Sequence, residues 1–307
     1  MKAHFFSLLL ASFLKSRTDA AWCYNSQMSC TSNCTGPEFW SNMSNSECNG
    51  QSQSPINIVT RKTELDKDLT PIHLTEYQGS YLWNIRNNGK SVQVNIPHGP
   101  LISGGKLKTF YRAVQFHLHW GKDGSPGSEH TVDGEQYPME LHIVHIKKQY
   151  TTLSEAQKDP TGLAVLGFFY EMSVNNNRNY DPITSALKNI IEAGANATIP
   201  NMTLTSIIPP QETLTKYFRY QGSLTTPNCA ESVVWTVFES TIPISMSQLS
   251  EFSKLKFQDG NPLAYNYRSV QPLNSRKVYR SGCDVVLASI TLLAATVLVS
   301  ITLSQSG

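Results

Sequence analysis

The sequence predicts a mostly β protein with a large central sheet and short helices at its periphery. Two observations carry this prediction: runs of alternating or apolar residues, and the turn residues that separate them. The run 163–170 is almost entirely apolar, which is typical of a strand covered on both faces. Turn signals occur at "NNGK" (87–90), "HGP" (98–100) and "SGG" (103–105). The predicted strands are 81–86, 91–96, 113–120, 139–147, 163–171 and 232–239.

Two segments are predicted to be surface helices packed on the sheet. Asp181 is expected to cap the first, with Pro182 at its first position and an end near Gly194. Ser247 is expected to cap the second. Each helix carries an apolar stripe, formed by Ile183, Leu187, Ile190 and Ile191 in the first and by Leu249, Phe252 and Leu255 in the second.

Both ends of the chain are predicted to be processing signals. Residues 1–20 combine an early lysine with an apolar run and small residues near Ala20, which is typical of a secretory signal peptide. Residues 285–303 are apolar and uncharged, and no basic residue follows them. This pattern predicts a GPI-attachment signal at 282–307, with Ser281 as the attachment residue. The alternative is a single-pass transmembrane helix.

The remaining segment, 21–281, is predicted to form one domain, because no repeat or low-complexity linker interrupts it. The two ends carry three basic and two acidic residues, so the net charge falls from +2 to about +1 when they are removed. This balance gives no reason to expect nucleic acid or an anionic surface as a partner.

Six cysteines behind a signal peptide predict disulfides, but composition does not assign the pairs. Four of them cluster near the start, and loss of Cys283 with the tail would leave one cysteine unpaired. Glycosylation sequons agree with the secretory route and begin at Asn33, Asn42, Asn196 and Asn201. Asn33 is the least expected to be used, because Cys34 is the middle residue of its sequon.

Three histidines predict a metal site. His117 and His119 share one face of a strand, because side chains alternate with period 2, and His142 lies on a second predicted strand. Three neutral imidazoles leave Zn²⁺ its charge and a fourth position for water, as in catalytic zinc sites. Gln115 and Glu140 precede a histidine by two residues, so each is placed to accept a hydrogen bond from its second ring nitrogen.

Other uses of histidine are disfavoured. The sequence contains no His-Glu-x-x-His motif of metalloproteases. A structural zinc site needs a fourth protein ligand, and the two histidine strands offer no cysteine. His145 has the opposite parity to His142 and is expected to face away from the metal. The remaining histidines are interpreted as hydrogen-bonded or surface residues, namely His73, His98 and His130.

The motifs "QSPINI" (53–58), "QFHLHWG" (115–121), "GSEHTVDG" (127–134), "ELHIVH" (140–145), "LAVLGFF" (163–169) and "GSLTTPNC" (222–229) resemble those of the α-carbonic anhydrases. The resemblance runs from about Trp22 to Tyr279 and is strongest to the GPI-anchored extracellular members. It implies a twisted, mainly antiparallel ten-stranded sheet with peripheral short helices. It also implies reversible hydration of carbon dioxide to bicarbonate and a proton by zinc-bound hydroxide, at the outer face of the plasma membrane.

The resemblance assigns roles to individual residues. It implies Zn²⁺ ligands at His117, His119 and His142, held by Gln115, Glu140 and the backbone carbonyl of Asn266. Thr225 matches the residue that hydrogen-bonds the zinc hydroxide, and Glu129 matches the carboxylate that accepts the threonine proton. The substrate pocket is implied to consist of Val144, Val165, Leu224, Thr226 and Trp235. The polar residues implied to line a water chain are Tyr24, Asn88 and Thr226.

The resemblance also implies two disulfides, Cys48–Cys229 and Cys23–Cys34, with Cys30 unpaired; alternatively, Cys30 replaces Cys34 as the partner of Cys23.

Lys90 departs from the family pattern, because it stands where fast members carry a proton-shuttling histidine. A lysine with a pKa of about 10.4 is already protonated at neutral pH, so slower proton transfer is expected. The implied partners are sulfonamide-type inhibitors and bicarbonate transporters. A binding domain without chemistry is disfavoured, because such domains typically lack a zinc histidine.

Overall fold

The structure is a computed structural model that describes residues 21–28, 34–96 and 99–282. Several predictions fall outside these residues: the signal peptide, Cys30, Asn33, His98 and the apolar tail from Cys283 onward. Within the described part of the chain, no helix combines the length and the apolar character needed to cross a bilayer.

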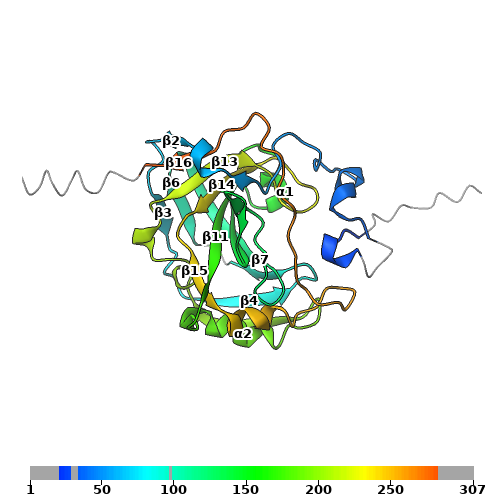
Figure 1. Ribbon diagram of the computed structural model, residues 1–307. Helices are drawn as coiled ribbons and strands as arrows, with labels where there is room; N and C mark the ends of the chain where they lie inside the picture. Colours follow the sequence, from blue (N-terminus) through cyan, green and yellow to red (C-terminus); the bar gives the residue numbers. More distant parts are fainter. Residues whose placement is uncertain (1–20, 29–33, 97–98, 283–307) are drawn as a thin grey trace, which may run out of the picture.

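A thirteen-stranded sheet forms the centre of the molecule (Figure 1). Its continuous order comprises ten strands, β12 (Asn196–Met202), β4 (Tyr81–Asn87), β5 (Val92–Asn95), β7 (Leu107–Trp120), β10 (Met139–Lys147), β11 (Leu163–Ser173), β14 (Val233–Phe238), β13 (Tyr217–Gly222), β16 (Tyr279–Ser281) and β2 (Glu64–Asp66). Three further strands belong to the sheet but lie outside that order. Strand β6 (Leu101–Gly104) pairs with β7, β3 (Ile72–Thr75) pairs with β6, and β15 (Ile242–Ser245) pairs with β11. A separate small sheet contains β1 (Asn57–Ile58), β8 (Thr131–Val132) and β9 (Glu135–Gln136).

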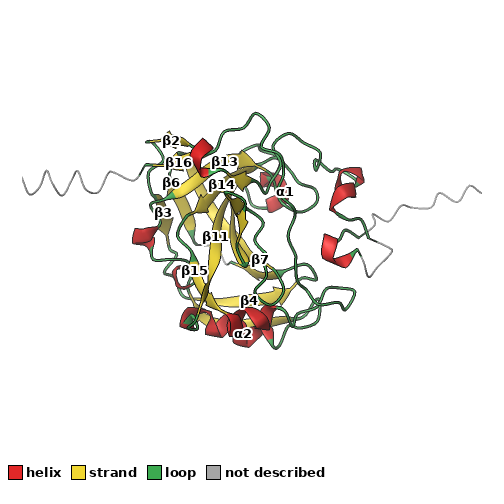
Figure 2. Cartoon of the chain, in the orientation of Figure 1, coloured by secondary structure: helices red, strands yellow, loops and turns green. Residues whose placement is uncertain are grey.

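Most neighbouring strands of the large sheet run antiparallel; the parallel pairs are β11–β14, β11–β15 and β16–β2. The helices are short and peripheral (Figure 2). The α-helices are α1 (Leu153–Ala156), α2 (Asp181–Leu187) and α3 (Met246–Phe252). The 3-10 turns span Asn25–Gln27, Pro37–Asn42, Thr60–Lys62, Arg178–Tyr180, Leu204–Ser206 and Gln211–Thr213. The mostly β fold class is therefore confirmed.

Strand β11 lies between two hydrophobic cores. All of its first eight residues are buried, as the apolar run predicted. Ala164, Leu166 and Phe168 belong to one hydrophobic cluster, whereas Val165 and Phe169 belong to the other. Alternate side chains thus point to opposite faces of the sheet, and each face is covered.

The helix boundaries differ from the prediction. Helix α2 ends at Leu187 rather than near Gly194. The residues that follow form 3-10 hydrogen bonds, in which an amide bonds the carbonyl three residues earlier; the Ile190 amide, for example, donates to the Leu187 carbonyl. Helix α3 is capped by Ser245, not Ser247: the Ser245 hydroxyl accepts the amide of Gln248 at 3.1 Å.

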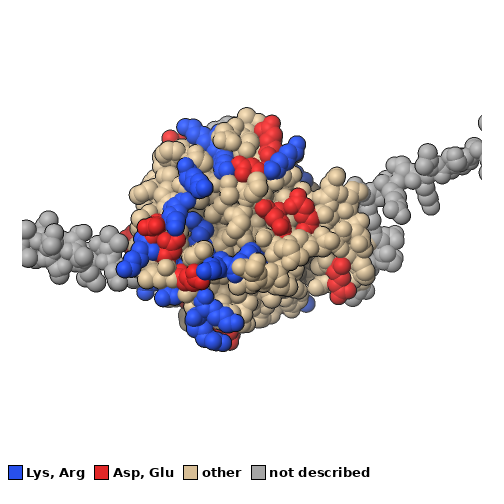
Figure 3. Space-filling view, turned by 90° about the horizontal axis from the view of Figure 1, so that it is seen from above, with Lys and Arg blue, Asp and Glu red and all other residues tan. Residues whose placement is uncertain are grey.

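The surface carries both signs of charge. Figure 3 shows Lys and Arg side chains intermixed with Asp and Glu over the face that it displays. The described N-terminal segment and strand β16 lie at opposite sides of the molecule (Figure 1).

Candidate metal centre

Strands β7 and β10 bring the three predicted ligands together. His142 is paired directly with His117 across the two strands, and Glu140 is paired with His119. The ring centroids lie 5.0 Å (His117–His119), 5.2 Å (His117–His142) and 4.7 Å (His119–His142) apart. One nitrogen from each ring lies within 4.8 Å of the other two, so the three rings can bind a single metal ion.

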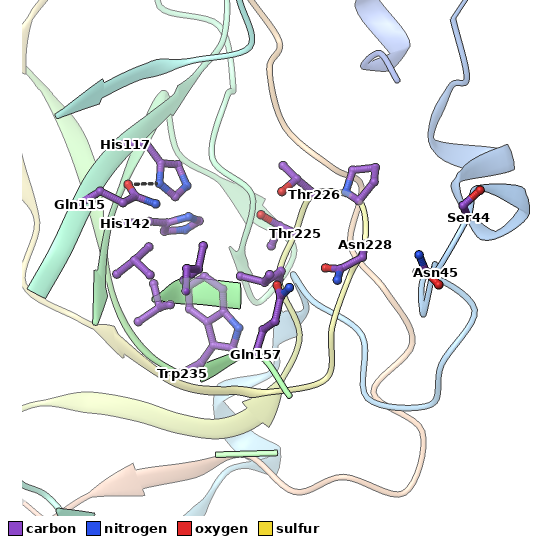
Figure 4. Close-up of a pocket in the computed structure, with 15 residues that line it drawn as sticks. Ser44, Asn45, Gln115, His117, His142, Gln157, Thr225, Thr226, Asn228 and Trp235 are labelled. Carbon is purple, nitrogen blue, oxygen red and sulfur yellow. Dashed lines mark hydrogen bonds between the residues drawn. The ribbon is translucent and has the colours of Figure 1, made fainter. Parts of the chain in front are cut away.

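The second ring nitrogen of each histidine has its own acceptor. Nδ1 of His117 lies 3.0 Å from Oε1 of Gln115 (Figure 4). Nδ1 of His119 lies 2.7 Å from the carbonyl oxygen of Asn266, and Nε2 of His142 lies 2.7 Å from Oε1 of Glu140. This arrangement leaves Nε2 of His117, Nε2 of His119 and Nδ1 of His142 for a ligand.

The unpaired atoms fit a metal ion. Among the described residues, Nε2 of His119 is buried and has no hydrogen-bond partner. Burial, followed by repulsion from the two neighbouring imidazoles, holds the pKa of His117 well below its usual value. Burial also lowers the pKa of His119, although Glu129 opposes the effect. Both rings are therefore neutral near pH 7, the state that a metal ligand requires.

Glu129 and Thr225 flank this centre. Oε1 of Glu129 accepts the Arg268 amide at 2.8 Å, which fixes the carboxylate. Its Oε2 is buried without a hydrogen-bond partner, 3.5 Å from Nε2 of His119 and 3.9 Å from Nδ1 of His142. Thr225 lies in the wall of the adjoining cavity. The structure records no hydrogen bond between these two described side chains.

A cavity of about 480 Å³ opens over the histidines. Its wall contains no Lys, Arg, Asp or Glu among the described residues. All five predicted pocket residues line it: Val144, Val165, Leu224, Thr226 and Trp235. Figure 4 shows His117 and His142 on one side and the 225–228 loop and the Ser44–Asn45 segment on the other. Sequence reasoning missed six lining residues, Ser44, Asn45, Leu153, Gln157, Pro227 and Asn228.

Of the residues implied to line the water chain, Thr226 lies in the cavity wall, whereas Tyr24 and Asn88 do not; Lys90, at the shuttle position, also lies outside the wall. Tyr24 is buried, and burial raises the pKa of its phenol well above the usual value. The Asn88 side chain donates to Oε1 of Gln93 at 3.1 Å. Nζ of Lys90 lies 4.7 Å from the ring centroid of Trp22. Burial lowers the pKa of Lys90, whereas nearby Asp259 opposes the change.

Two other histidines are core residues, as interpreted. His130 lies 2.7 Å from Oε1 of Glu140 through Nδ1 and 2.6 Å from the Tyr220 hydroxyl through Nε2. His145 faces away from the metal centre, and its Nε2 lies 2.6 Å from the Tyr77 hydroxyl.

Both implied disulfides are present, Cys23–Cys34 and Cys48–Cys229. The alternative in which Cys30 replaces Cys34 is therefore wrong. Cys229 follows the cavity residue Asn228, and the Glu47 amide donates to the Asn228 carbonyl at 2.8 Å. The second disulfide thus fixes the N-terminal segment beside the cavity loop.

Comparison with known proteins agrees with this site. Residues 35–282 match the eukaryotic-type carbonic anhydrase family. Carbonic anhydrase 4 of Rattus norvegicus is 40% identical over 291 residues, which cover 93% of this chain and 92% of the rat protein. The Oryctolagus cuniculus protein of the same name is 41% identical, over 85% and 84% of the two chains. Carbonic anhydrase 15 of Mus musculus is 35% identical, over 90% and 88%. The chain therefore belongs to the eukaryotic-type carbonic anhydrases, enzymes that hydrate carbon dioxide.

Proposed function

We propose that this carbonic anhydrase is zinc-dependent and acts at the outer surface of the plasma membrane. The observation that carries the zinc assignment is the hydrogen bonding of the three histidines. Each ring has one nitrogen engaged by a protein acceptor, and Nε2 of His119 is buried without any partner. A buried nitrogen lone pair left in this state, beside the two histidines that line the cavity, supports a metal ligand.

The proposed ligands are Nε2 of His117, Nε2 of His119 and Nδ1 of His142. When bound there, zinc lowers the pKa of a coordinated water to about 7, an effect for which carbonic anhydrase is itself the standard example. No fourth protein ligand completes the histidine cluster among the described residues, so a position is left for solvent.

Glu129 and Thr225 are proposed to orient the attacking oxygen. Oε2 of Glu129 is positioned beside the histidines and has room for one donor. If Thr225 donates its proton there, its oxygen can only accept a hydrogen bond from the nucleophile, which aims a nucleophile lone pair at the substrate. Val144, Val165 and Trp235 supply an apolar wall. Carbon dioxide has no net dipole and suits such a wall.

We propose that this protein releases the product proton more slowly than family members that carry a histidine at the position of Lys90. Lys90 stands at the shuttle position, and its ammonium is held over Trp22 and 3.3 Å from Oε1 of Gln27. An ammonium that is already protonated cannot accept the proton that must leave the metal centre.

The extracellular location is proposed from the two ends of the sequence, a signal peptide at 1–20 and a GPI-attachment signal at 282–307. Ser281 is the proposed attachment residue. It ends strand β16, and its hydroxyl accepts the Tyr217 amide and donates to the Thr215 carbonyl, so the ordered contacts of the sheet extend to this residue. Bicarbonate transporters are the proposed membrane partners. Release of the enzyme from cells by phosphatidylinositol-specific phospholipase supports the lipid anchor; retention supports a spanning helix.

The zinc proposal is tested on the purified protein by metal analysis and a carbon dioxide hydration assay. We expect one zinc per chain and sulfonamide binding, both lost in His117→Ala. His73→Ala is the matched control, because His73 is exposed and lies on β3. Absence of both stoichiometric zinc and hydration activity would contradict the proposal and favour a binding domain. Full activity of the His117 variant would contradict the assignment of His117 as a zinc ligand.

A further inference from the structure

We propose that Asn42 carries an N-linked glycan that stands at the mouth of the active-site cavity and excludes large ligands, while carbon dioxide passes freely. The inference rests on the proposed zinc site only through its experiment, which measures how fast sulfonamides bind there. Its structural basis is the position of one sequon, Asn42-Met43-Ser44. Asn42 ends a 3-10 helix and is exposed, and Ser44, the third residue of the sequon, itself lines the cavity.

The sequon lies on the rim of the cavity. Ser44 and Asn45 line the cavity beside the 225–228 loop, on the side away from His117 and His142 (Figure 4). Two residues of extended chain span at most about 7 Å, so the Cα atom of Asn42 lies within that distance of Ser44. A glycan is much larger than this separation, so one attached here is long enough to extend over the opening.

The rim segment is fixed at both ends, so the glycan cannot move away with its attachment point. On one side, Trp40 is fully buried, and its indole nitrogen donates to the Thr35 carbonyl at 3.1 Å. The Arg268 guanidinium lies 5.6 Å from the centroid of the same ring. On the other side, the Cys48–Cys229 disulfide joins the segment to the neighbouring 225–228 loop.

The expected selection is by size, not charge. No described residue of the cavity wall is a Lys, Arg, Asp or Glu, and the charge of the proposed metal acts equally on the free and the polymer-linked sulfonamide. Carbon dioxide, water and bicarbonate are small enough to pass beside a flexible sugar chain. A sulfonamide carried on a polymer must displace that chain before it can reach the histidines, which slows its association.

The modification uses the ordinary secretory donor, a lipid-linked diphospho-oligosaccharide. A bond forms between Nδ2 of Asn42 and the anomeric carbon of the sugar. The bond from that carbon to the lipid diphosphate breaks, and the amide loses one proton. The linkage requires the sequon, which Asn42, Met43 and Ser44 supply, and the exposed position of Asn42 leaves space for the sugar in the folded protein.

The other described sequons do not lie at the cavity. Asn196 and Asn201 are exposed residues of β12, the strand at the end of the sheet order. Two strands, β4 and β5, separate β12 from the histidine strand β7. At about 4.8 Å per strand, this places β12 about 14 Å from β7. Asn196→Gln is therefore the matched control: it removes a sequon without changing the rim.

The experiment compares the glycosylated cell-surface enzyme with Asn42→Gln, with Asn196→Gln, and with folded enzyme treated with a peptide N-glycosidase. Glycopeptide mass spectrometry establishes occupancy of Asn42. Association rates are measured for free benzenesulfonamide and for the same group linked to dextran. We expect the dextran-linked probe to associate several-fold faster with Asn42→Gln and with the deglycosylated enzyme. The free probe, carbon dioxide hydration and the Asn196→Gln variant should show no change.

Two results would overturn the inference: an unmodified Asn42 in the cell-surface protein, or equal association of the dextran-linked probe with and without the glycan. Enzymatic deglycosylation of the folded protein guards against a folding defect in the variant. Failure of the free sulfonamide to bind any form, together with absent hydration, would contradict the proposed function and the screening role with it.

Discussion

Oε1 of Glu140 lies 2.7 Å from Nε2 of His142 and 2.7 Å from Nδ1 of His130. Its other oxygen accepts the amides of Glu129 and His130, both at 2.8 Å. Burial favours the neutral acid, but attraction to the two histidines and the hydrogen bonds outweigh it, so the pKa of Glu140 lies well below its usual value. Glu140 is therefore an ionised acceptor that fixes the protonated nitrogen of His142.

Replacement of Glu140 by Gln should weaken zinc binding. The amide keeps the shape of the side chain but removes the charge and one acceptor oxygen, so His142 is no longer held in one tautomer. Changes to such partners of metal ligands typically cost about 10–100-fold in metal affinity. Competition with a chelator measures the dissociation constant. Glu135→Gln, an exposed change on β9, is the control, and equal affinities of the two variants would refute the role of Glu140.

Much of the metal centre could be predicted from local sequence. Period-2 alternation placed His117 and His119 on one face and His145 on the other, and the structure agrees. The cavity mouth could not be predicted in this way. Ser44 and Asn45 reach the cavity because a disulfide joins residues 181 positions apart, a constraint that leaves no periodic pattern near residue 44. Asn266 was implied by resemblance alone, since it acts through its backbone carbonyl.

Two of the strands that escaped prediction, β13 and β12, lack regular alternation for identifiable reasons. In β13, four consecutive residues are buried, and one of them is Arg219. Its guanidinium is satisfied by the Gly105 carbonyl and the Thr236 hydroxyl, partners that are distant in sequence. Strand β12 contains Pro200 and a register shift between Ile199 and Met202. It lies at the sheet edge, where a proline is tolerated.

The two disulfides should differ in their contribution to stability. Cys48–Cys229 spans 181 residues and Cys23–Cys34 spans 11. In the chain-entropy account, the longer loop constrains the unfolded state more, by about 5 kcal/mol against about 3 kcal/mol. The Cys48→Ser/Cys229→Ser double variant should therefore lose more free energy of unfolding than Cys23→Ser/Cys34→Ser. Urea denaturation measures both, in a Cys30→Ser background that prevents thiol exchange. Equal losses would show that loop length does not govern these bonds.

Lys90→His should raise turnover at low buffer concentration. An imidazole has a pKa of about 6.5, so at neutral pH it is free to accept the proton that leaves the metal centre. The hydration step itself, followed by isotope exchange, should change little. Stopped-flow hydration at low and high buffer concentration separates the two steps.

Lys90→Ala is the matched control for that substitution. It removes the ammonium without supplying an acceptor, so it should leave low-buffer turnover unchanged. A loss of turnover in Lys90→Ala would show that Lys90 already transfers protons, consistent with the direction in which burial moves its pKa. Unchanged turnover in Lys90→His would contradict the shuttle argument.

His145 should make the fold sensitive to acid. Burial lowers the pKa of His145 to about 4, whereas an unfolded histidine titrates at about 6.5. Between these values the unfolded chain binds a proton that the folded chain does not, so stability falls as the pH decreases. The loss of folding free energy amounts to roughly 3 kcal/mol over that window.

His145→Gln cannot titrate, so its free energy of unfolding should decline less steeply between about pH 7 and about pH 5, measured by urea denaturation. The exposed His73→Gln variant should follow the parent protein, because its side chain is solvated in both states. Parallel declines for the parent and His145→Gln would show that other groups control the acid response.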